Sequence, residues 1–400
     1  MTERTFVVVG ASLAGGAAVR TLRDEGFDGR IILIGDEPEP PYERPPLSKA
    51  YLRGEDEEPT SLLPEPWYAE QGIELRLGVR ARRIDLDARA VELEEGERVG
   101  FDALLLATGG RPRELPGVPR SERVTYLRRI ADADRIRGHL GPGRRLAIVG
   151  AGFIGTEVAA SARMLGTEVT LIDPGTAPLK RALGPEMGGV VAGIHRDHGV
   201  ELRLGASVEG VEEAGGAVRV GIEDGEPVEA DAVVIGIGMV PNVELAAEAG
   251  LEVDGGVAVD AAGRTSAEGV HAAGDVARHD HPLFGPIRIE HYDNALKMGA
   301  AVARTMLGSD EPFDDPHWFW SDQYDVQLQM AGVAMRWDEL VVRGSVPERD
   351  FTAFYLQEGV LLSALSIGRP KDVRRAMKLI GARPGPEALR DEGLDLRTLT

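Results

Sequence analysis

Three glycines and one acid form the pattern whose chemistry is easiest to read in this chain. The residues Gly150-Ala-Gly152-Phe-Ile-Gly155 follow an apolar run, and Asp173 stands 23 positions after Gly150. Gly150 allows a tight turn, Gly152 lets backbone amides approach a pyrophosphate, and Gly155 lets a helix pack close to a strand. A carboxylate at Asp173 can accept hydrogen bonds from an adenosine ribose. This spacing predicts a dinucleotide-binding unit.

The elements that position these residues can be read on either side of the glycines. Residues 146–149 are expected to form a strand, and the helix that begins in the glycine pattern is expected to end near Gly166. A second strand, residues 168–172, then delivers Asp173. The N-terminus of the helix offers free N–H groups and the positive end of its dipole to the phosphates.

The first thirty-five residues repeat this organisation. An apolar strand over residues 6–9 leads into Gly10-Ala-Ser12-Leu-Ala-Gly15, a helix over residues 13–25, a strand over residues 30–34 and then Asp36. Ser12 replaces the middle glycine and brings a small β-carbon near the phosphates. An ordinary βαβ unit without a ligand is the alternative. Two such units in one chain are what a flavin–nicotinamide enzyme needs, so the sequence suggests FAD at one and NAD(P) at the other.

The composition excludes several other classes of protein. The chain has 400 residues, 43% of them hydrophobic, which is enough for the buried cores of two or three domains. A net charge of −21 argues against a nucleic-acid partner, because phosphate backbones require lysine and arginine. There is no cysteine, which removes disulfides, thiolate-ligated clusters and cysteine nucleophiles. No apolar stretch approaches the length of a membrane span, and a cytoplasmic protein is expected.

The last eighty residues have a different pattern of apolar and polar residues. Val326, Leu328 and Met330 alternate with polar residues, as do parts of 339–346 and 351–367, and three antiparallel strands are predicted. Asp372 is expected to cap a basic helix that follows them.

Several further motifs together resemble one family, the FAD-dependent NADH:ferredoxin reductases that serve cytochrome P450 and Rieske oxygenase systems. They are Arg44-Pro-Pro-Leu-Ser-Lys49, Ala107-Thr-Gly-Gly-Arg-Pro112, Gly150 to Glu157, Gly274-Asp275, Arg288-Ile-Glu290 with Asn294-Ala295, and Trp318-Phe-Trp320-Ser-Asp-Gln-Tyr324. The proline–lysine loop and the tryptophan segment discriminate best, since the glycine patterns and Gly274-Asp275 are shared with many related flavoproteins.

The resemblance implies an α/β fold with two Rossmann-like dinucleotide-binding domains, nested as in glutathione reductase, and an α+β C-terminal domain. Residues 1–112 and 240–316 would form the FAD-binding domain. Residues 113–239 would form the NAD-binding domain inserted within it, and residues 317–400 the C-terminal domain.

The resemblance also implies the residues that would contact each cofactor. Those expected at a non-covalently bound FAD are Gly10, Ser12, Ala14, Gly15, Asp36, Arg44, Pro45, Lys49, Ala81, Thr108, Gly109, Arg128, Gly274, Asp275, Tyr292 and Trp320. Those expected at NADH are Gly150, Gly152, Phe153, Ile154, Gly155, Glu157, Asp173, Arg181 and Gly236. Asp36 would hold the adenosine ribose of FAD, and Asp275 would hold its ribityl chain.

Three residues are candidates for the chemistry itself. A cation at Lys49 beside the flavin would stabilise its reduced, anionic form, and a surface lysine is the alternative. Glu157 would orient both Lys49 and the nicotinamide carboxamide. Trp320 would lie against the flavin on the side where electrons leave, or would be a plain core aromatic. Asp173 favours NADH because a carboxylate repels a 2′-phosphate, although Lys180 and Arg181 lie nearby.

Other groups of charged residues are expected to be inert. His195 and His198 are spaced for one helix face, but with no third ligand evident a solvated pair is expected rather than a metal site. His279 and His281 receive the same interpretation, and no metal is expected. The basic group Arg374, Arg375 and Lys378 is interpreted as a solvated helix face, with steering of an acidic ferredoxin as the alternative.

The expected function is therefore transfer of a hydride from NADH to FAD and of single electrons to a [2Fe–2S] ferredoxin, with a rubredoxin as a second partner. No nucleic acid or membrane is expected as a partner, and the protein is expected to be a monomer or a homodimer. An NADH oxidase or a protein like apoptosis-inducing factor is one alternative function. A sensor that binds FAD and NADH without turnover is another.

Overall fold

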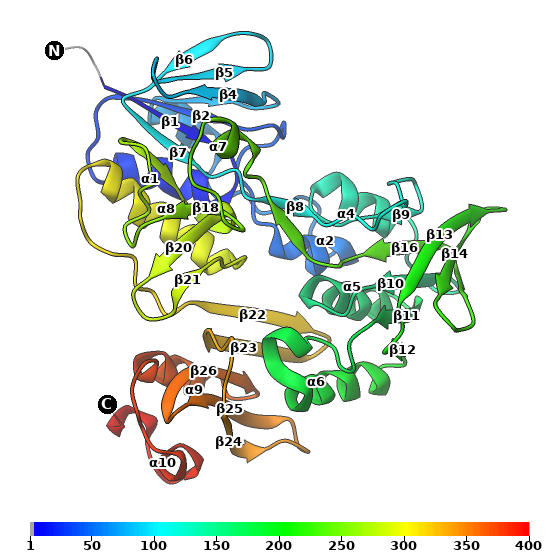
Figure 1. The fold of residues 1–400 in the computed structure, drawn as a ribbon. Coiled ribbons are helices and arrows are strands. Elements are labelled where there is room, and N and C mark those ends of the chain that lie inside the picture. Colours follow the sequence, from blue (N-terminus) through cyan, green and yellow to red (C-terminus); the bar gives the residue numbers. More distant parts are fainter. Residues whose placement is uncertain (1–3, 400) are drawn as a thin grey trace. The chain divides into compact units, whose positions relative to one another are not determined.

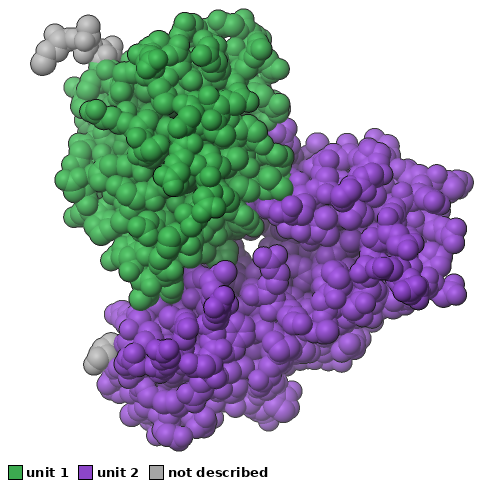
Figure 2. All heavy atoms as spheres, in the orientation of Figure 1, with its two compact units in different colours: residues 1–43, 60–111, 240–317 green, residues 44–59, 112–239, 318–400 purple. Residues whose placement is uncertain are grey.

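The computed structural model describes residues 4–399 (Figure 1). The chain divides into two compact units, coloured separately in Figure 2. Unit 1 comprises residues 1–43, 60–111 and 240–317, and unit 2 comprises residues 44–59, 112–239 and 318–400. The short strands β8 (Gly110–Pro112) and β17 (Met239–Pro241) fall where the chain passes from one unit to the other.

Unit 1 is built on a five-stranded parallel sheet of order β19-β7-β1-β2-β3. Its strands are β1 (Thr5–Val9), β2 (Arg30–Ile34), β3 (Ile73–Arg76), β7 (Ala103–Leu106) and β19 (Val270–Ala272). In the central strand, Val8 pairs with Leu33 on one side and Leu105 on the other. The three inner strands are continuous apolar runs because both of their faces are buried.

Helices α1 (Leu13–Asp24) and α8 (Tyr292–Met306) pack together in unit 1. They approach closely because α8 carries Gly299: a β-carbon there would lie 2.3 Å from the carbonyl oxygen of Ala14. Two further three-stranded sheets and short helices complete the unit: β4 (Ala81–Asp85), β5 (Ala90–Leu93), β6 (Arg98–Gly100), β18 (Val257–Val259), β20 (Ala277–His281), β21 (Gly285–Ile287), α3 (Glu65–Glu70), α7 (Glu244–Glu248) and η2 (Gly274–Val276).

Unit 2 contains a second parallel sheet, of order β12-β11-β10-β16-β9. Its strands are β9 (Val124–Thr125), β10 (Arg145–Val149), β11 (Glu168–Asp173), β12 (Glu201–Leu204) and β16 (Ala232–Ile235). The helices around it are η1 (Pro45–Ser48), α2 (Ala50–Arg53), α4 (Ile130–Arg137), α5 (Phe153–Met164) and α6 (Lys180–Asp197), and a small sheet adds β13 (Val208–Ala214), β14 (Ala217–Ile222) and β15 (Val228–Ala230). The strand–glycine–helix–strand–acid order expected from the sequence is present in both parallel sheets.

The C-terminal part of unit 2 is an antiparallel sheet of order β22-β23-β26-β25-β24. It consists of β22 (Trp318–Gln323), β23 (Val326–Gly332), β24 (Glu339–Ser345), β25 (Asp350–Gln357) and β26 (Val360–Ile367), followed by α9 (Pro370–Ala376), η3 (Met377–Leu379), α10 (Pro386–Arg390) and η4 (Leu396–Thr398). One face packs on α6, where Met187 and Val191 share a buried cluster with Met330 and Tyr355 (Figure 1).

This sheet corrects two predictions from the sequence. The sheet has five strands where three were expected, because Trp318–Gln323 forms a strand that was not predicted and because 351–367 is a hairpin. The turn of that hairpin is made by Glu358 and Gly359, both at positive φ. Helix α9 begins at Pro370, so Asp372 lies in its first turn and does not cap it. The Asp372 carboxylate instead pairs with the buried Arg343, at 3.4 Å.

Candidate functional site

The glycine turn of unit 2 has the geometry expected of a dinucleotide fingerprint. Gly150 lies at φ +102°, and a β-carbon on it would come 2.3 Å from the carbonyl oxygen of Gly236. A β-carbon on Gly155 would come 1.9 Å from the carbonyl oxygen of Gly150. Both positions therefore exclude every other residue, and Gly236 closes the turn from β16.

Gly152 differs from these two glycines. It is the N-cap of α5, and a β-carbon on it would meet only the Gly236 oxygen, at 4.0 Å. The space beside it is open, so a pyrophosphate could approach the first amides of α5. In the first turn of α5, Ile154 leaves 41% of its surface exposed, so an apolar side chain is available beside the open turn. The turn fits a bound dinucleotide on both counts.

The acid predicted at the end of the second strand lies next to this turn. The carboxylate of Asp173 accepts hydrogen bonds from the N–H groups of Ala151 and Gly175, each at 2.7 Å. These bonds fix the side chain, and the remaining lone pairs of its oxygens can still accept ribose hydroxyls. Lys180 and Arg181 are exposed at the start of α6.

A buried ion pair joins the proline–lysine loop to the fingerprint helix. The ammonium nitrogen of Lys49 lies 2.5 Å from Oε2 of Glu157, and the two side chains are 12% and 5% exposed. Two hydroxyls also donate to this carboxylate, from Ser48 at 2.5 Å to Oε2 and from Ser321 at 2.7 Å to Oε1. Glu157 is thereby held by three donors, and the structure brings together the lysine and the glutamate selected from the sequence.

Strand β22 contributes to this network by the alternation of its side chains. Phe319, Ser321 and Gln323 all face α5: Phe319 contacts Phe153, with ring centroids 4.8 Å apart, and Gln323 donates to Thr156 at 3.0 Å. Trp320 belongs to the opposite set, where its indole N–H donates to Asp322 at 3.1 Å. Trp320 is therefore separated from Glu157 by the strand itself.

Two further residues predicted at FAD, Arg44 and Arg128, are neighbours in unit 2. The guanidinium of Arg44 donates to the carbonyl oxygen of Arg128 at 2.7 Å. Pro45 begins the 3-10 helix η1, whose far end carries Ser48 and leads into Lys49. The prolines of this loop thus set the backbone that presents the lysine to Glu157.

The fingerprint of unit 1 repeats the close packing of unit 2. Gly10 lies at φ +119°, and a β-carbon on it would come 2.0 Å from the carbonyl oxygen of Ala107. A β-carbon on Gly15 would come 2.0 Å from the carbonyl oxygen of Gly10. Ser12 is the N-cap of α1 and occupies the position that Gly152 holds in the other unit. Gly274 lies at φ +75°, facing Ala14.

The other predicted FAD residues of unit 1 lie on several of its elements. Asp36 follows β2 and pairs with Arg80 at 3.2 Å, and Asp275 lies in the first turn of η2. Tyr292 begins α8 and donates to Glu43 at 2.8 Å, and burial raises the pKa of its hydroxyl well above its usual range. Ala81 begins β4 and is buried.

A cross-link missed from the sequence holds the end of β7 in unit 1. The hydroxyl of Thr108 donates to the carbonyl oxygen of Asn242 at 2.7 Å, and the Asn242 amide returns a bond to the carbonyl oxygen of Thr108 at 2.8 Å. The N–H of Asn242 also donates to Gly109 at 2.9 Å. Asn242 thus fixes two predicted FAD residues.

The expectation of solvated histidine pairs was wrong. His195 is fully buried and bonded to Gln323 and Tyr324 at 2.9 and 3.0 Å, and burial lowers its pKa to about 4. His279 and His281 are 3% and 2% exposed on β20. Helix and strand packing, which spacing alone does not show, bury them. No group of three metal-ligating residues that could hold an ion occurs within residues 4–399.

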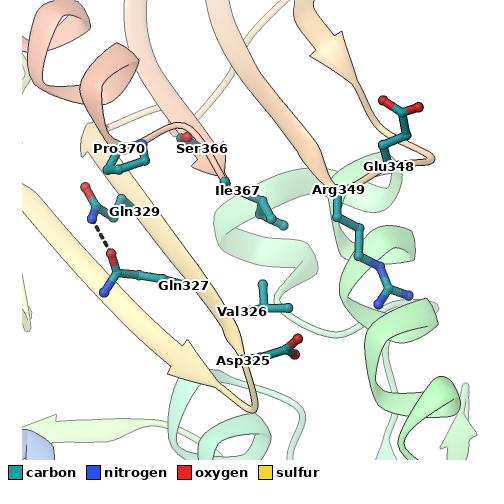
Figure 3. A pocket seen from close by; sticks show the side chains of 10 residues that line it. Asp325, Val326, Gln327, Gln329, Glu348, Arg349, Ser366, Ile367 and Pro370 are labelled. Atoms are coloured by element: carbon teal, nitrogen blue, oxygen red, sulfur yellow. Dashed lines mark hydrogen bonds between the residues drawn. The ribbon is translucent and has the colours of Figure 1, made fainter.

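A pocket of about 380 Å³ lies in the C-terminal sheet (Figure 3). Its lining mixes acidic, basic and amide side chains, among them Asp325, Gln329 and Glu348. Gln329 donates to Gln327 at 2.6 Å, and Arg349 pairs with Asp197. None of its ten lining residues was predicted at a cofactor.

Comparisons with known proteins identify the family of this chain. A model of the pyridine nucleotide-disulphide oxidoreductase family matches residues 4–299, and a reductase C-terminal model matches residues 318–400. The chain belongs to the pyridine nucleotide-disulphide oxidoreductase family. Because it has no cysteine, it lacks the redox disulfide to which the family name refers.

More specific similarity is to reductases of oxygenase systems. The chain is 40% identical to rhodocoxin reductase of Rhodococcus erythropolis, over 98% of this chain and 93% of that protein. It is also 40% identical to the ferredoxin–NAD(+) reductase component of the anthranilate 1,2-dioxygenase system of Burkholderia cepacia, over the full length of both. A solved covalent complex of putidaredoxin reductase with putidaredoxin matches with a TM-score of 0.95 and 38% identity, over 99% of this chain and 98% of that one. The predicted fold class is confirmed.

Proposed function

We propose that this protein is an FAD-dependent NADH:ferredoxin reductase that passes single electrons to a [2Fe–2S] ferredoxin, which in turn supplies a P450 or Rieske-type oxygenase. The names of its relatives support this function, since one serves a dioxygenase system and a structural relative was solved bound to putidaredoxin. The observation that carries the proposal is the buried ion pair between Lys49 of the proline–lysine loop and Glu157 on the helix of a dinucleotide fingerprint.

FAD supplies the central chemistry, because it accepts two electrons as a hydride from nicotinamide and releases them one at a time. The protein contributes binding, orientation and electrostatics. In unit 2 we assign the pyrophosphate of NADH to the open side of Gly152 and the N-terminus of α5, with Gly150, Gly155 and Gly236 shaping the turn. Phe153, Ile154 and Arg181 would contact the same nucleotide, and Asp173 its adenosine ribose.

The residues of unit 1 would bind the nucleotide part of FAD. Gly10, Ser12, Ala14 and Gly15 surround the N-terminus of α1, where a pyrophosphate would be favoured. We assign the adenosine ribose to Asp36 and the ribityl chain to Asp275. Further contacts in this unit are assigned to Ala81, Thr108, Gly109, Gly274 and Tyr292, and in unit 2 to Arg44, Pro45, Arg128 and Trp320.

Lys49 and Glu157 would work as a pair. A lysine held at 2.5 Å by a buried carboxylate stays in one position, and its charge would favour the anionic form of the reduced flavin. Glu157 would also accept a hydrogen bond from the nicotinamide carboxamide, which orients the pyridine ring for hydride transfer.

The nucleotide preference follows from Asp173. Its carboxylate lies beside the fingerprint, where it would repel the 2′-phosphate of NADPH. Arg181 is exposed at the start of α6 and would reduce the discrimination, so NADH is the proposed substrate without strict exclusion of NADPH.

The remaining assignments concern domains, location and assembly. We propose that residues 1–112 with 240–316, residues 113–239 and residues 317–400 act as FAD-binding, NAD-binding and C-terminal domains. No helix within residues 4–399 is long and apolar enough to cross a membrane. Work in the cytoplasm, where NADH is supplied, and a monomeric or homodimeric state are further proposals, which cell fractionation and light scattering would test.

An anaerobic titration with NADH tests the proposed function. The purified protein should be yellow with bound FAD, and one equivalent of NADH should bleach the flavin absorption. In a separate aerobic assay without a ferredoxin, oxygen consumption should be slow. Fast oxygen consumption without an added ferredoxin would indicate an NADH oxidase instead, and a flavin that NADH does not bleach would indicate a sensor.

A further inference from the structure

A continuous line of hydrogen bonds runs from Glu157 to helix α6. Ser321 donates to Oε1 of Glu157 at 2.7 Å, and the amide nitrogen of Gln323 lies 3.1 Å from the Ser321 hydroxyl. The amide oxygen of Gln323 lies 2.9 Å from Nε2 of His195, and Nδ1 of His195 lies 3.0 Å from the hydroxyl of Tyr324. Ser321, Gln323 and His195 are all fully buried.

The orientation of the Gln323 amide follows from its two neighbours. The hydroxyl of Thr156 donates to a carbonyl oxygen of its own helix, Gly152 or Phe153, both at 3.0 Å. The hydroxyl of Ser321 donates to the Glu157 carboxylate, which pairs with Lys49 and therefore only accepts. Both hydroxyls present lone pairs to Gln323, so its NH₂ group must face them and its carbonyl must face His195.

The protonation of His195 follows in turn. Because the Gln323 oxygen can only accept, Nε2 of His195 carries a hydrogen and donates it. Burial lowers the pKa of His195 to about 4, so the ring is neutral near pH 7 and its Nδ1 is an acceptor. The Tyr324 hydroxyl donates to that nitrogen, and the Tyr324 ring is stacked on His198, with centroids 3.6 Å apart.

Every donor in this line points toward Glu157. The order is Tyr324 to His195, His195 to Gln323, Gln323 to Ser321, and Ser321 to the carboxylate, and hydrogen bonds in such a one-way chain polarise one another. We propose that His195 and Gln323 are positioning residues that hold the Glu157 carboxylate in the orientation that receives the nicotinamide carboxamide. This inference rests on the proposed function, because there Glu157 binds NADH.

The line of hydrogen bonds also connects two parts of unit 2. His195 belongs to α6 of the NAD-binding segment, whereas Gln323 and Tyr324 belong to β22 and the residue after it. A purely structural link between these parts also exists: the Tyr355 hydroxyl donates to the carbonyl oxygen of Leu183 on α6 at 2.9 Å and is fully buried. Tyr355 is thus a control, since it joins the part of α6 before the break at Gly184 to the same sheet without reaching Glu157.

The experiment measures the affinity of the FAD-loaded protein for NAD⁺ by calorimetry, together with urea unfolding. Gln323→Leu leaves Ser321 and His195 without their shared partner and should raise the dissociation constant about tenfold, the equivalent of one hydrogen bond. Tyr324→Phe removes only the outermost donor and should raise it about threefold. Tyr355→Phe should lower the unfolding midpoint as much as Tyr324→Phe does and leave the dissociation constant at the wild-type value.

A pair of substitutions at His195 separates its hydrogen bonds from its packing. His195→Leu fills the space but neither donates nor accepts, so it should weaken NAD⁺ binding about tenfold. His195→Gln can donate on one side and accept on the other, and should recover most of that loss. Nitrogen-15 NMR of the imidazoles should show a neutral His195 ring with its hydrogen on Nε2, identified by the signal that His195→Gln removes.

The possible results distinguish a failure of the positioning role from a failure of the proposed function. Equal NAD⁺ affinity in wild type, Tyr324→Phe and His195→Leu would overturn the positioning role and leave the proposed function standing. A hydrogen on Nδ1 of His195, or a charged His195 ring at pH 7, would overturn the proposed direction of the hydrogen bonds. Wild-type protein that bound no NAD⁺ would overturn both proposals. If Gln323→Leu does not fold, Tyr324→Phe and the His195 pair decide the result.

Discussion

Replacement of Lys49 by methionine tests the electrostatic part of the proposed mechanism. Methionine keeps a similar length and removes the charge, so the space beside Glu157 stays filled. The substitution leaves the Glu157 carboxylate, 5% exposed, with two hydroxyl donors and no counter-ion. A charge-assisted hydrogen bond between buried groups is worth about 2 kcal/mol. A loss of that size corresponds to a roughly thirtyfold slower flavin reduction.

Stopped-flow absorbance after anaerobic mixing with NADH measures this rate. Stability must be measured beside it, because an unpaired buried carboxylate lowers the free energy of unfolding by about 3 kcal/mol. The double variant Lys49→Met/Glu157→Gln removes that unpaired charge and should recover much of the stability but not the rate. The interaction free energy from the double-mutant cycle then measures the coupling of the pair.

A second buried ion pair supplies the control. Asp372→Asn neutralises the carboxylate that lies 3.4 Å from the buried Arg343 in the C-terminal sheet. It should lower the free energy of unfolding and leave the reduction rate unchanged. A Lys49→Met variant that reduces its flavin at the wild-type rate would remove Lys49 from the mechanism, whatever its stability.

Three further predictions concern the turn, the nucleotide and pH. Gly155→Ala places a β-carbon 1.9 Å from a carbonyl oxygen and should weaken NAD⁺ binding by about tenfold or more while FAD content stays normal, which calorimetry and absorbance will check. Asp173→Asn should shift the ratio of kcat/KM values toward NADPH on the order of tenfold, and an unchanged ratio would refute the repulsion argument. Burial lowers the pKa of His195 and His271 to about 4 and that of His317 to about 3. In the unfolded chain the histidine pKa is about 6.5, so between about pH 6.5 and pH 4 the unfolded chain binds more protons than the folded protein does. The free energy of unfolding should therefore fall as pH drops from about 6.5 toward 4, and equal urea midpoints at pH 7 and 5 would contradict this.

The sequence predicted the parts of the fold that local rules determine. The spacing of Gly150, Gly155 and Gly10 predicts that the backbone requires glycine at these positions. The structure places each of them against a carbonyl oxygen that excludes a side chain. Apolar runs on both sides of the glycines gave the parallel strands, because strands buried on both faces read as continuous hydrophobic segments.

The hydrogen-bond network around Glu157 could not be predicted in the same way. Its members come from sequence positions far apart, such as Ser48, Ser321 and His195, and no local rule joins a helix residue to a strand 128 positions later. A signal was present, since Ser321 and Gln323 alternate on one strand and share a face, but the partner of that face depended on the packing of β22 against α5.

The histidines show the limit of spacing arguments. His195 and His198 stand three residues apart, which is equally compatible with a solvated face and with a face packed on another element. Helix α6 packs on the C-terminal sheet, so His195 is buried in the core. It differs from an apolar core residue only in the hydrogen bonds that its ring nitrogens make. Tertiary contact, and not the pattern, decides such cases.

Reconstitution with a ferredoxin tests the central claim most directly. The purified protein, NADH, a [2Fe–2S] ferredoxin encoded near its gene and cytochrome c are combined, and cytochrome c reduction is followed by absorbance. Reduction should be slow without the ferredoxin and should increase with its concentration until it saturates. A rate that does not change when the ferredoxin is added, in protein whose flavin NADH bleaches, would contradict electron transfer to a ferredoxin.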